Sequence, residues 1–401
     1  MQPKTMLSML LLSASCWLNA QNVDIPAVFT AAEKQSNLMA NEVAKKRSSK
    51  PELVSPRTLK DGSLVCVASK DWTSGFFPGQ LWFLYEHTGS SSWKDLARTY
   101  TARIEKEKLN GTTHDMGFKI NNSFGNGYRL TQDPRYRDII IQAAKTLSTR
   151  FNPVVGAIKS WDDKERWDYP VIIDNMMNLE LLFHATELTG DSSFYRIAVT
   201  HANTTLKHHF RADNSSFHVV DFDVSTGQVT QKTTHQGAFD GSAWSRGQAW
   251  GLYGFTMCYR FTRNSVYLRQ AEKIATFILT HPNLPGDGIP YWDFNAPKIP
   301  NEPRDVSAAA ITTSALYELS LYSQGVYDFR SAAHRLLENL TKSYRSAAGK
   351  NKGFLLLHGT GNKPSGSEVD VPLIYADYYF IESLMRAKKL KQNQPFFYVP
   401  V

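Results

Sequence analysis

Cysteine is scarce in this chain, which has three cysteines among 401 residues. Cys16 lies in an N-terminal apolar segment, so only Cys66 and Cys258 belong to the rest of the sequence. Two cysteines cannot build a disulfide framework or a cysteine-based zinc site. The sequence also lacks a His/Cys/Asp cluster at the spacing of metal ligands and any glycine-rich nucleotide-binding motif. We therefore predict no metal and no organic cofactor.

Charged runs, Pro/Gly/Ser-rich linkers and a basic arm interleaved with aromatic residues are also missing. The net charge of +8 comes from Lys and Arg residues scattered along amphipathic segments, such as 105–108 and 386–391. This scatter is typical of a solvated surface, and no nucleic-acid-binding motif accompanies it. Length alone would allow two or three domains, but without a linker the sequence favours one large domain.

The first 20 residues have the pattern of a secretory signal peptide. Lys4 supplies the positive charge, and the apolar run 6–17 is too short to span a membrane. Cleavage before Gln21 would leave 21–401 as the mature chain. A lipid on Cys16 is the alternative, but the residues before it lack the usual leading Leu. Both alternatives predict an exported protein, and we expect a periplasmic one.

The dominant pattern is a turn that recurs between helical segments. An apolar helix ends, a turn rich in Gly, Asn, Asp and Ser follows, and an aromatic residue opens the next helix. The five turns begin at Thr88, Thr131, Thr189, Thr262 and, more loosely, Tyr322. Gly and Asn end one helix, and Asp and Ser cap the next. The irregular spacing argues against a short-period solenoid, so the pattern indicates a set of helical hairpins.

The hydrophobic periodicity predicts six pairs of helices. One helix of each pair is amphipathic, and the other is apolar nearly all round, as buried helices are. The amphipathic helices are expected at 28–46, 92–108, 134–150, 192–209, 264–280 and 327–346. The buried helices are expected at 75–87, 117–130, 173–189, 243–262, 307–322 and 374–389. Six buried helices inside six amphipathic ones form an all-α toroid.

Longer irregular stretches precede the buried helices. They cover 47–74, 109–116, 152–172, 210–242, 282–306 and 350–373. A strand hairpin is expected within 217–232. Because each stretch leads into a buried helix, all of them should gather on one face, where long loops usually carry binding and catalytic residues.

Two aspartates stand where loops enter buried helices. Asp174 has six apolar neighbours within five positions, and Asp115 lies in the segment His114-Asp-Met-Gly-Phe118. Burial should raise the pKa of Asp174 and leave a neutral acid available near neutral pH. Capping of the following helix is the alternative for both residues. Two carboxylates in one cleft are the usual equipment of a glycosidase, although sequence does not give the separation that distinguishes inverting from retaining enzymes.

A third segment combines a cation with aromatic rings. Within 243–251, Trp244, Arg246 and Trp250 alternate with small residues. Small residues let a ligand approach the backbone, indole rings offer stacking faces, and arginine binds a carboxylate through two hydrogen bonds. An internal ion pair is the alternative for the arginine. Trp72 and His218 stand in comparable places, where a packed ring and a structural histidine are the alternatives.

Four segments together give the chain a family resemblance. They are Gly75-Phe-Phe-Pro-Gly79, His114-Asp-Met-Gly-Phe118, Ile173-Asp-Asn-Met-Met-Asn-Leu179 and Ser245-Arg-Gly-Gln-Ala-Trp-Gly251. On these motifs the whole mature chain resembles the unsaturated glucuronyl hydrolases of glycoside hydrolase family 88. The resemblance implies an (α/α)6 barrel with long loops on the active-site face, in agreement with six pairs of helices. It also implies an exo-acting enzyme that removes a 4,5-unsaturated uronic acid from the non-reducing end of lyase-generated glycosaminoglycan oligosaccharides.

The reaction that the resemblance implies is hydration of a vinyl ether, in which a proton adds at C4 and water at C5. The resulting hemiketal opens and releases the neighbouring sugar, which differs from direct displacement at the glycosidic bond. The resemblance makes Asp174 the general acid and base. It makes Asp115 the partner that binds sugar hydroxyls and tunes Asp174, and the titration of two such carboxylates belongs to the pair.

The resemblance also implies a binding pocket around the two aspartates. The polar positions are His114, His218, Gln236 and Arg246, and the aromatic walls are Trp72, Trp161, Trp244 and Trp250. The loop 361–368 resembles the region that reads the aglycone, where Ser365 and Ser367 offer hydroxyls to a carboxylate or sulfate. A flexible Gly/Ser loop is the alternative there. The spacing departs from the Ser-x-x-Ser-x-Lys arrangement of members that favour sulfated chondroitin, which leaves the sulfation preference open.

Three other functions remain alternatives. Unsaturated rhamnogalacturonyl hydrolases share the barrel and the chemistry, but they typically have Asn-Gly where this chain has Gln248-Ala249. A conventional inverting glycosidase would need a glutamic acid at the mouth, and no loop Glu stands out. A sugar-binding protein would bind its ligand without turnover. For the enzyme we expect an unsaturated oligosaccharide substrate, no nucleic acid, no membrane span, and a monomer or weak dimer.

Overall fold

The computed structural model describes residues 23–163, 165–325 and 327–397. The predicted signal segment 1–20 lies outside these residues. Helices dominate the described chain, and its strands form one three-stranded and two two-stranded sheets. The mostly helical fold that the periodicity predicts is therefore confirmed. Along the described residues, no helix combines the length and apolarity needed to cross a bilayer.

The six amphipathic helices lie close to the predicted positions. They are α1 (Ile25–Ser49), α3 (Ser91–Ala102), α5 (Pro134–Ser148), α7 (Ser192–His208), α9 (Ser265–Thr280) and α11 (Phe329–Ser343). Five of them begin at an Asp or Asn whose side chain accepts a hydrogen bond from a backbone N–H of the first turn. In α5, the apolar residues Ile139, Ile140, Ala143 and Leu147 are all buried, so the predicted apolar face is the packed one.

The apolar partner helices also lie where the periodicity places them. They are α2 (Phe76–Thr88), the π-helix η3 (Gly117–Gly125) followed by α4 (Asn126–Thr131), the 3-10 helix η4 (Ile173–Asn178) followed by α6 (Leu179–Thr189), α8 (Ser245–Thr262), α10 (Val306–Leu319) and α12 (Ile374–Lys391). Every residue of α10 is buried. Helices α2 and α6 end at Gly89 and Gly190, whose φ angles of 70° and 74° explain the glycine of the recurring turn.

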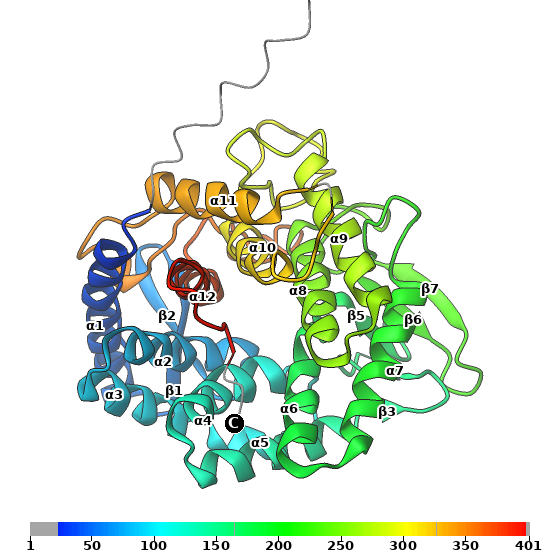
Figure 1. The fold of residues 1–401 in the computed structure, drawn as a ribbon, viewed down its shortest axis with the longest axis horizontal. Coiled ribbons are helices and arrows are strands. Elements are labelled where there is room, and N and C mark those ends of the chain that lie inside the picture. Colours follow the sequence, from blue (N-terminus) through cyan, green and yellow to red (C-terminus); the bar gives the residue numbers. More distant parts are fainter. Residues whose placement is uncertain (1–22, 164, 326, 398–401) are drawn as a thin grey trace, which may run out of the picture.

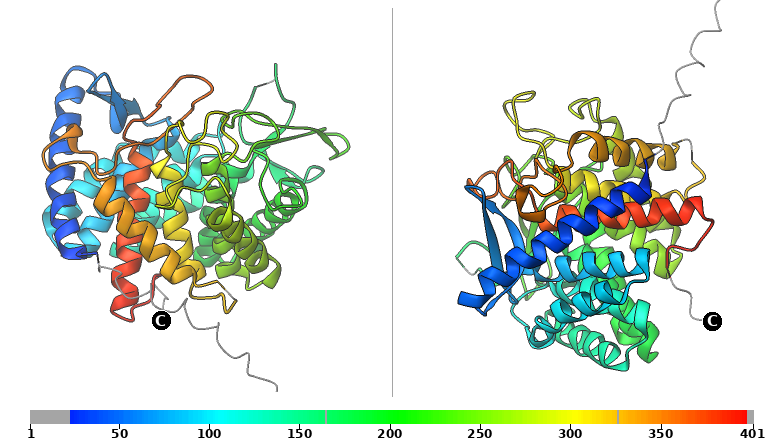
Figure 2. Two further views of the ribbon diagram at one scale, coloured as in Figure 1. Left: turned by 90° about the horizontal axis from the view of Figure 1, so that it is seen from above. Right: turned by 90° about the vertical axis from the view of Figure 1, so that its left-hand side faces the viewer.

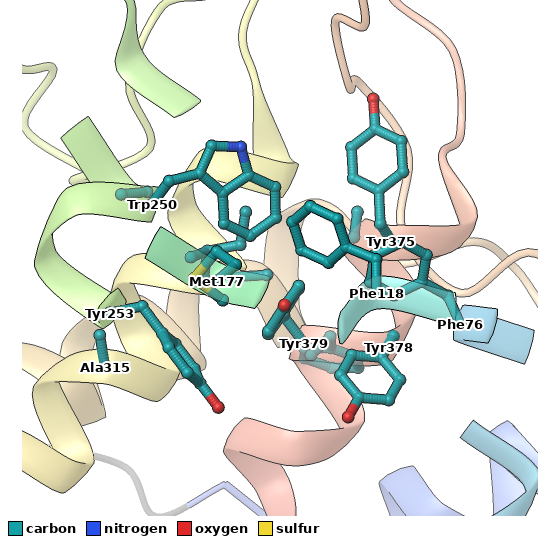
Figure 3. Close-up of a cluster of buried hydrophobic side chains, with 14 of the residues drawn as sticks. Phe76, Phe118, Met177, Trp250, Tyr253, Ala315, Tyr375, Tyr378 and Tyr379 are labelled. Carbon is teal, nitrogen blue, oxygen red and sulfur yellow. The ribbon is translucent and has the colours of Figure 1, made fainter. Parts of the chain in front are cut away.

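The apolar helices are neighbours of one another in the interior. Helix α10 contacts α8 and α12, α12 contacts α2, and α2 contacts η3, while α6 contacts both η3 and α8. The amphipathic helices lie outside them, as Figure 1 shows for α1, α3, α9 and α11. The interior is rich in aromatic side chains, and Figure 3 shows Phe118, Trp250 and Tyr379 among them. Three short 3-10 helices complete the helical elements: η1 (Trp72–Gly75), η2 (Glu105–Leu109) and η5 (Asn351–Gly353).

The strands and long loops gather at one end of the helices (Figure 2). All strand pairs are antiparallel. They join β1 (Leu53–Lys60) to β2 (Ser63–Ala68), β3 (Phe151–Asn152) to β4 (Ala157–Ile158), and β6 (Val219–Phe222) to both β5 (Pro170–Ile172) and β7 (Val229–Thr233). The predicted hairpin within 217–232 is confirmed by β6 and β7.

The hairpin of β1 and β2 differs from the prediction, which treated 47–74 as irregular. Its turn is Asp61-Gly62, where both residues have positive φ angles, of 50° and 71°. Lys60 pairs with Ser63 across the turn. An Asp-Gly pair between alternating residues is a strong signal for a two-residue hairpin, so this element was predictable from the sequence.

Candidate active site

The candidate residues come together because the long loops all enter the interior at the same end. Asp174 lies in the first turn of η4, and Asp115 lies two residues before the start of η3. Trp244 is the N-cap residue of α8, and Arg246 lies in its first turn. Trp72 begins η1. These positions are the N-terminal ends of the apolar helices, as predicted for the loop-bearing face.

Asp174 is the most perturbed carboxyl of this group. Its side chain is only 13% exposed, and its Oδ2 atom has no hydrogen-bond partner among the described residues. Burial raises the pKa of Asp174 to about 7, against the opposing effect of the Arg246 charge. The negative charge of Asp115 also raises this pKa. The direction agrees with the prediction from the apolar neighbours.

Asp115 is held by the two residues that precede it. The Thr113 hydroxyl donates a 2.6 Å hydrogen bond to Asp115 Oδ2 and accepts one of 3.1 Å from the Asp115 backbone N–H. The His114 Nε2 atom lies 3.3 Å from Asp115 Oδ1. Neither Asp115 nor Asp174 forms the side-chain cap of its helix, because no such bond is made at η3 or η4. The capping alternative is therefore wrong for both.

A glycine brings the two aspartate-bearing elements together. A Cβ atom on Gly117 would lie 2.6 Å from the Cα atom of Asn178, so only glycine allows this approach of η3 to η4. The contact is completed by a 3.1 Å hydrogen bond from the Phe118 backbone N–H to Asn178 Oδ1. The glycine of the His-Asp-Met-Gly motif thus sets the relative position of the two carboxylates.

His218 faces Asp174 with a defined ring nitrogen. The backbone N–H groups of His235 and Gln236 donate to His218 Nδ1 at 3.2 and 3.1 Å. Because Nδ1 accepts, the neutral ring carries its proton on Nε2, which lies 3.6 Å from Asp174 Oδ2. Burial lowers the pKa of His218 well below its usual value. His218 is therefore a neutral ring whose Nε2–H lies near Asp174 Oδ2, and neither atom has a hydrogen-bond partner among the described residues.

Arg246 and Gln236 both hold a loop above the site. The fully buried Arg246 guanidinium pairs with Asp305 at 2.7 Å and donates to the backbone carbonyls of Thr360 and Gly361. Gln236 Nε2 donates to the Gly361 carbonyl at 2.9 Å. The internal ion pair considered for Arg246 is thus present. Its charge nevertheless reaches Asp174 and lowers the pKa of that carboxyl.

Four tryptophans surround these polar groups at different depths. The Trp161 ring lies 6.5 Å from His114 and 6.4 Å from His218, and Trp244 lies 4.5 Å from His218. Trp72 packs on Phe118 at 5.4 Å, and the fully buried Trp250 packs on the same ring at 5.1 Å. Trp250 Nε1 has no partner among the described residues. Trp250 is buried among the aromatic side chains of the interior (Figure 3), and its side chain lowers the pKa of Asp174, while Trp72 and Trp161 are partly exposed.

Ser365 and Ser367 lie at the exposed tip of the loop that Arg246 holds. Gly359 pairs with Val371, and Asn362 pairs with Ser367, so 359–371 forms a hairpin. The Ser365 hydroxyl donates to the Asn362 carbonyl at 3.1 Å. Both serines are exposed, and their described hydrogen bonds stay within this hairpin.

Tyr375 and Thr113 are site residues that sequence reasoning missed. The Tyr375 side chain is buried, yet its hydroxyl has no partner among the described residues. Its ring lies 4.9 Å from Trp72 and 5.3 Å from the Arg246 guanidinium carbon, and Figure 3 shows its hydroxyl pointing away from the aromatic core. Tyr375 stands where a loop enters α12, so the rule that found Asp174 would also have found it.

The opposite end of the apolar helices contains a cavity of about 420 Å³. Its lining includes Glu86, Arg129, Glu180 and Glu382 but none of the candidate site residues. These charges pair with one another, for example Arg129 with Glu86 at 2.6 Å. No three His, Cys, Asp or Glu side chains of the described residues are grouped to hold a metal ion.

A carboxylic acid with a pKa near neutrality, a second carboxylate and several indole faces are together the equipment of a glycoside hydrolase. Residues 50–288 match the profile of Glycosyl Hydrolase Family 88. The chain belongs to glycoside hydrolase family 88. The family and enzyme class predicted from the four motifs are therefore confirmed.

Similar proteins include unsaturated glucuronyl hydrolases. The Formosa agariphila unsaturated glucuronyl hydrolase is 54% identical over 81% of this chain and 82% of its own. The crystal structure of an unsaturated glucuronyl hydrolase specific for heparin is 40% identical, with a TM-score of 0.85 over 90% of this chain and 98% of its own. A mutant of the Streptococcus agalactiae enzyme, complexed with dGlcA-GalNAc6S, is 29% identical, with a TM-score of 0.75 over 92% of this chain and 93% of its own.

Proposed function

We propose that this protein is an exo-acting hydrolase of lyase-generated glycosaminoglycan oligosaccharides. It removes the 4,5-unsaturated uronic acid from their non-reducing end. The single observation that carries this proposal is Asp174, a buried carboxyl with a pKa of about 7 and an unpaired Oδ2 atom beside Asp115 and His218. The names and substrates of the similar proteins support the same substrate class.

Asp174 begins the reaction as a neutral acid and donates its proton to C4 of the unsaturated uronate. The Asp174 carboxylate then takes a proton from the water that adds at C5. His218 stabilises the carboxylate between these steps, because its Nε2–H is directed at Asp174 Oδ2. The C5 hemiketal opens the ring, and the neighbouring sugar leaves with its glycosidic oxygen.

Asp115 positions the sugar and raises the pKa of Asp174. Its carboxylate, fixed by Thr113 and His114, accepts hydrogen bonds from sugar hydroxyls, and its charge helps to keep the proton on Asp174. Arg246 attracts the uronate carboxylate through its charge, and with Gln236 it holds the hairpin 359–371 over the site. Hairpin residues Ser365 and Ser367 face the aglycone side.

Trp72, Trp161 and Trp244 supply the aromatic faces of this pocket, while Trp250 supports them from below. Sugars bind to such faces through their C–H surfaces, which leaves their hydroxyls free for the polar groups. We also infer that the six hairpins close into an (α/α)6 barrel. The neighbour contacts of α2, η3, α6, α8, α10 and α12 support this arrangement.

We further propose that 1–20 is a signal peptide and that 21–401 is a single catalytic domain exported to the periplasm. The charged, apolar and small-residue order of the N-terminus supports export. Fractionation of cells that express the full chain, followed by N-terminal sequencing, tests this. A mature N-terminus at Gln21 is expected, and a lipid-modified Cys16 would contradict it.

The activity is tested with unsaturated disaccharides from chondroitin, hyaluronan and heparin, and with unsaturated rhamnogalacturonide. Loss of the ultraviolet absorbance of the double bond measures turnover. Wild type should consume at least one glycosaminoglycan disaccharide, and Asp174→Asn should not. Turnover of the rhamnogalacturonide alone would identify an unsaturated rhamnogalacturonyl hydrolase. Binding of a sugar, with no turnover of any of the substrates, would indicate a sugar-binding protein.

A further inference from the structure

Arg166, on the loop between β4 and β5, and His235, which follows β7, form a small basic cluster. Arg166 is exposed, and its guanidinium carbon lies 4.2 Å from the centre of the buried Trp167 ring. Its Nη1 atom lies 3.4 Å from Nδ1 of His235. Trp167 is itself anchored by a hydrogen bond of 3.2 Å from its Nε1 to Thr233 on β7. The arginine is therefore held on a fixed platform rather than free in solvent.

The loop that carries Arg166 also carries Asp162, Asp163, Glu165 and Asp168, but none of these carboxylates, all within the described residues, forms an ion pair with the cluster. Among the described residues, no ion pair includes Arg166 or His235. Asp163 acts on His235 electrostatically, and its described hydrogen bonds are made by its backbone carbonyl with the N–H groups of Arg166 and Trp167. An arginine that contacts a histidine and an indole, without an acidic partner, retains donors for an oxyanion.

Trp161 connects the basic cluster to the two aspartates. Its ring lies 5.7 Å from the ring of His235 and 5.6 Å from that of Trp167. The same ring lies 6.4 Å from His218, whose Nε2 faces Asp174. A sugar that stacks on the partly exposed Trp161 ring would thus lie between the unsaturated uronate, next to His218 and Asp174, and the guanidinium group of Arg166.

We propose that Arg166, His235 and Trp161 form a subsite for an anionic group, a sulfate or a carboxylate, on the aglycone that the reaction releases. This inference rests on the proposed function, because it assigns the aglycone of the same reaction. The guanidinium forms charge-assisted hydrogen bonds with the oxyanion, the neutral His235 supplies its free N–H, and Trp161 carries the sugar ring. The subsite selects acidic oligosaccharides independently of Ser365 and Ser367.

The test compares matched substrates in one assay of double-bond loss. These are an unsaturated chondroitin disaccharide without sulfate, the same disaccharide with one sulfate on its hexosamine, and the unsulfated unsaturated chondroitin tetrasaccharide, which brings a second uronate. The quantity is the ratio of kcat/KM for each acidic substrate to that for the unsulfated disaccharide. A gain with the sulfated disaccharide identifies a sulfate, and a gain with the tetrasaccharide identifies a carboxylate.

Arg166→Gln should lower the favoured ratio about tenfold, as expected for loss of a charge-assisted hydrogen bond. The matched control is Arg196→Gln, an exposed arginine on α7 that contacts Ser192, and it should keep the wild-type ratio. A ratio unchanged in Arg166→Gln, or a wild-type enzyme that favours neither acidic substrate, overturns the subsite. Absence of wild-type turnover on every substrate instead overturns the proposed function on which the subsite rests.

Discussion

In the proposed mechanism, Asp174 can serve as both acid and base because its surroundings stabilise both of its protonation states. Burial and the charge of Asp115 favour the proton, while the charge of Arg246 opposes them. The balance is a pKa of about 7. Once the proton has left, the Nε2–H of His218 is available to the anion at 3.6 Å. One carboxyl can therefore complete a hydration reaction without a second acid.

The first prediction concerns the pH dependence of this acid. Because the protonated form of Asp174 acts, kcat/KM should fall as pH rises through about 7, approaching tenfold per pH unit. In Asp115→Asn the fall should begin at lower pH, since the charge that raises the pKa of Asp174 is removed. Initial rates between pH 5 and 9 measure both. A wild-type profile that stays flat through neutrality would contradict this assignment.

The second prediction is that ionisation of Asp174 lowers the free energy of unfolding. The folded pKa of about 7 is above the ordinary aspartate value of about 3.9, so the native state binds more protons than the unfolded state between these values. Wild-type stability should therefore decrease as pH rises through this window. Asp174→Asn removes the effect and should exceed wild type by about 4 kcal/mol at pH 8, with little difference at pH 4. Urea unfolding at the two pH values measures this, and equal stability at pH 8 would refute it.

Sequence alone located Asp174 and its direction of titration, because the apolar residues on both sides of it place this segment in the interior. It did not show that Arg246 pairs with Asp305, since 58 residues separate the two in the chain. The tautomer of His218 was likewise out of reach, because it depends on two backbone N–H groups of a neighbouring loop. Such facts follow from tertiary packing and not from local pattern.

At the scale of elements, the close approach of η3 to η4 controls the site. Gly117→Ala should separate them, because the added Cβ would meet backbone 2.6 Å away. We expect a loss of about 1–3 kcal/mol in stability and about 100-fold in kcat/KM, since the two carboxylates lose their relative position. Thermal unfolding and the ultraviolet assay measure these.

The matched control for this change is Gly286→Ala. Gly286 has open space around its Cβ position and an ordinary φ angle, so the same substitution should leave both quantities near wild type. If Gly117→Ala behaved like Gly286→Ala, the glycine would not set the geometry of the site.

The sequence predicted all twelve major helices because amphipathic and apolar periodicities alternate along the chain. Helix ends followed from caps such as Asp191 and from the left-handed Gly190. The hairpin of β1 and β2 was missed although its Asp61-Gly62 turn is a local signal. The short strands β3 and β5 are different, because two or three residues give too little periodicity to detect.

In the molecule as a whole, buried charges join the C-terminal parts of α8, α10 and α12 to the first turn of α6. Glu318 on α10 accepts from Arg260 on α8 at 2.9 Å and pairs with Arg386 on α12 at 3.2 Å. Arg260 also pairs with Glu180 on α6 at 2.8 Å. One network therefore joins four helices far from the two aspartates of the site.

Glu318→Gln should destabilise the fold by about 3 kcal/mol, because it leaves two buried arginines without a full counter-charge. The melting temperature should fall by several degrees, while kcat of the remaining folded enzyme changes little. Glu105→Gln, which breaks the exposed pair with Lys108, is the control and should have almost no effect. Equal melting temperatures for the two variants would show that the buried network does not stabilise the fold.

The central claim is that Asp174 protonates C4 of an unsaturated uronate and so starts hydration of the double bond. Proton NMR in D2O, with an unsaturated disaccharide that wild type consumes, tests it most directly. We expect the vinyl H-4 signal to be lost at the rate at which the free aglycone appears, and one deuterium to be added at C4 in a single configuration. Asp174→Asn should stop both the loss of the vinyl signal and the release of the aglycone. Accumulation of free uronic acid with its vinyl signal intact, or wild-type rates in Asp174→Asn, would contradict it.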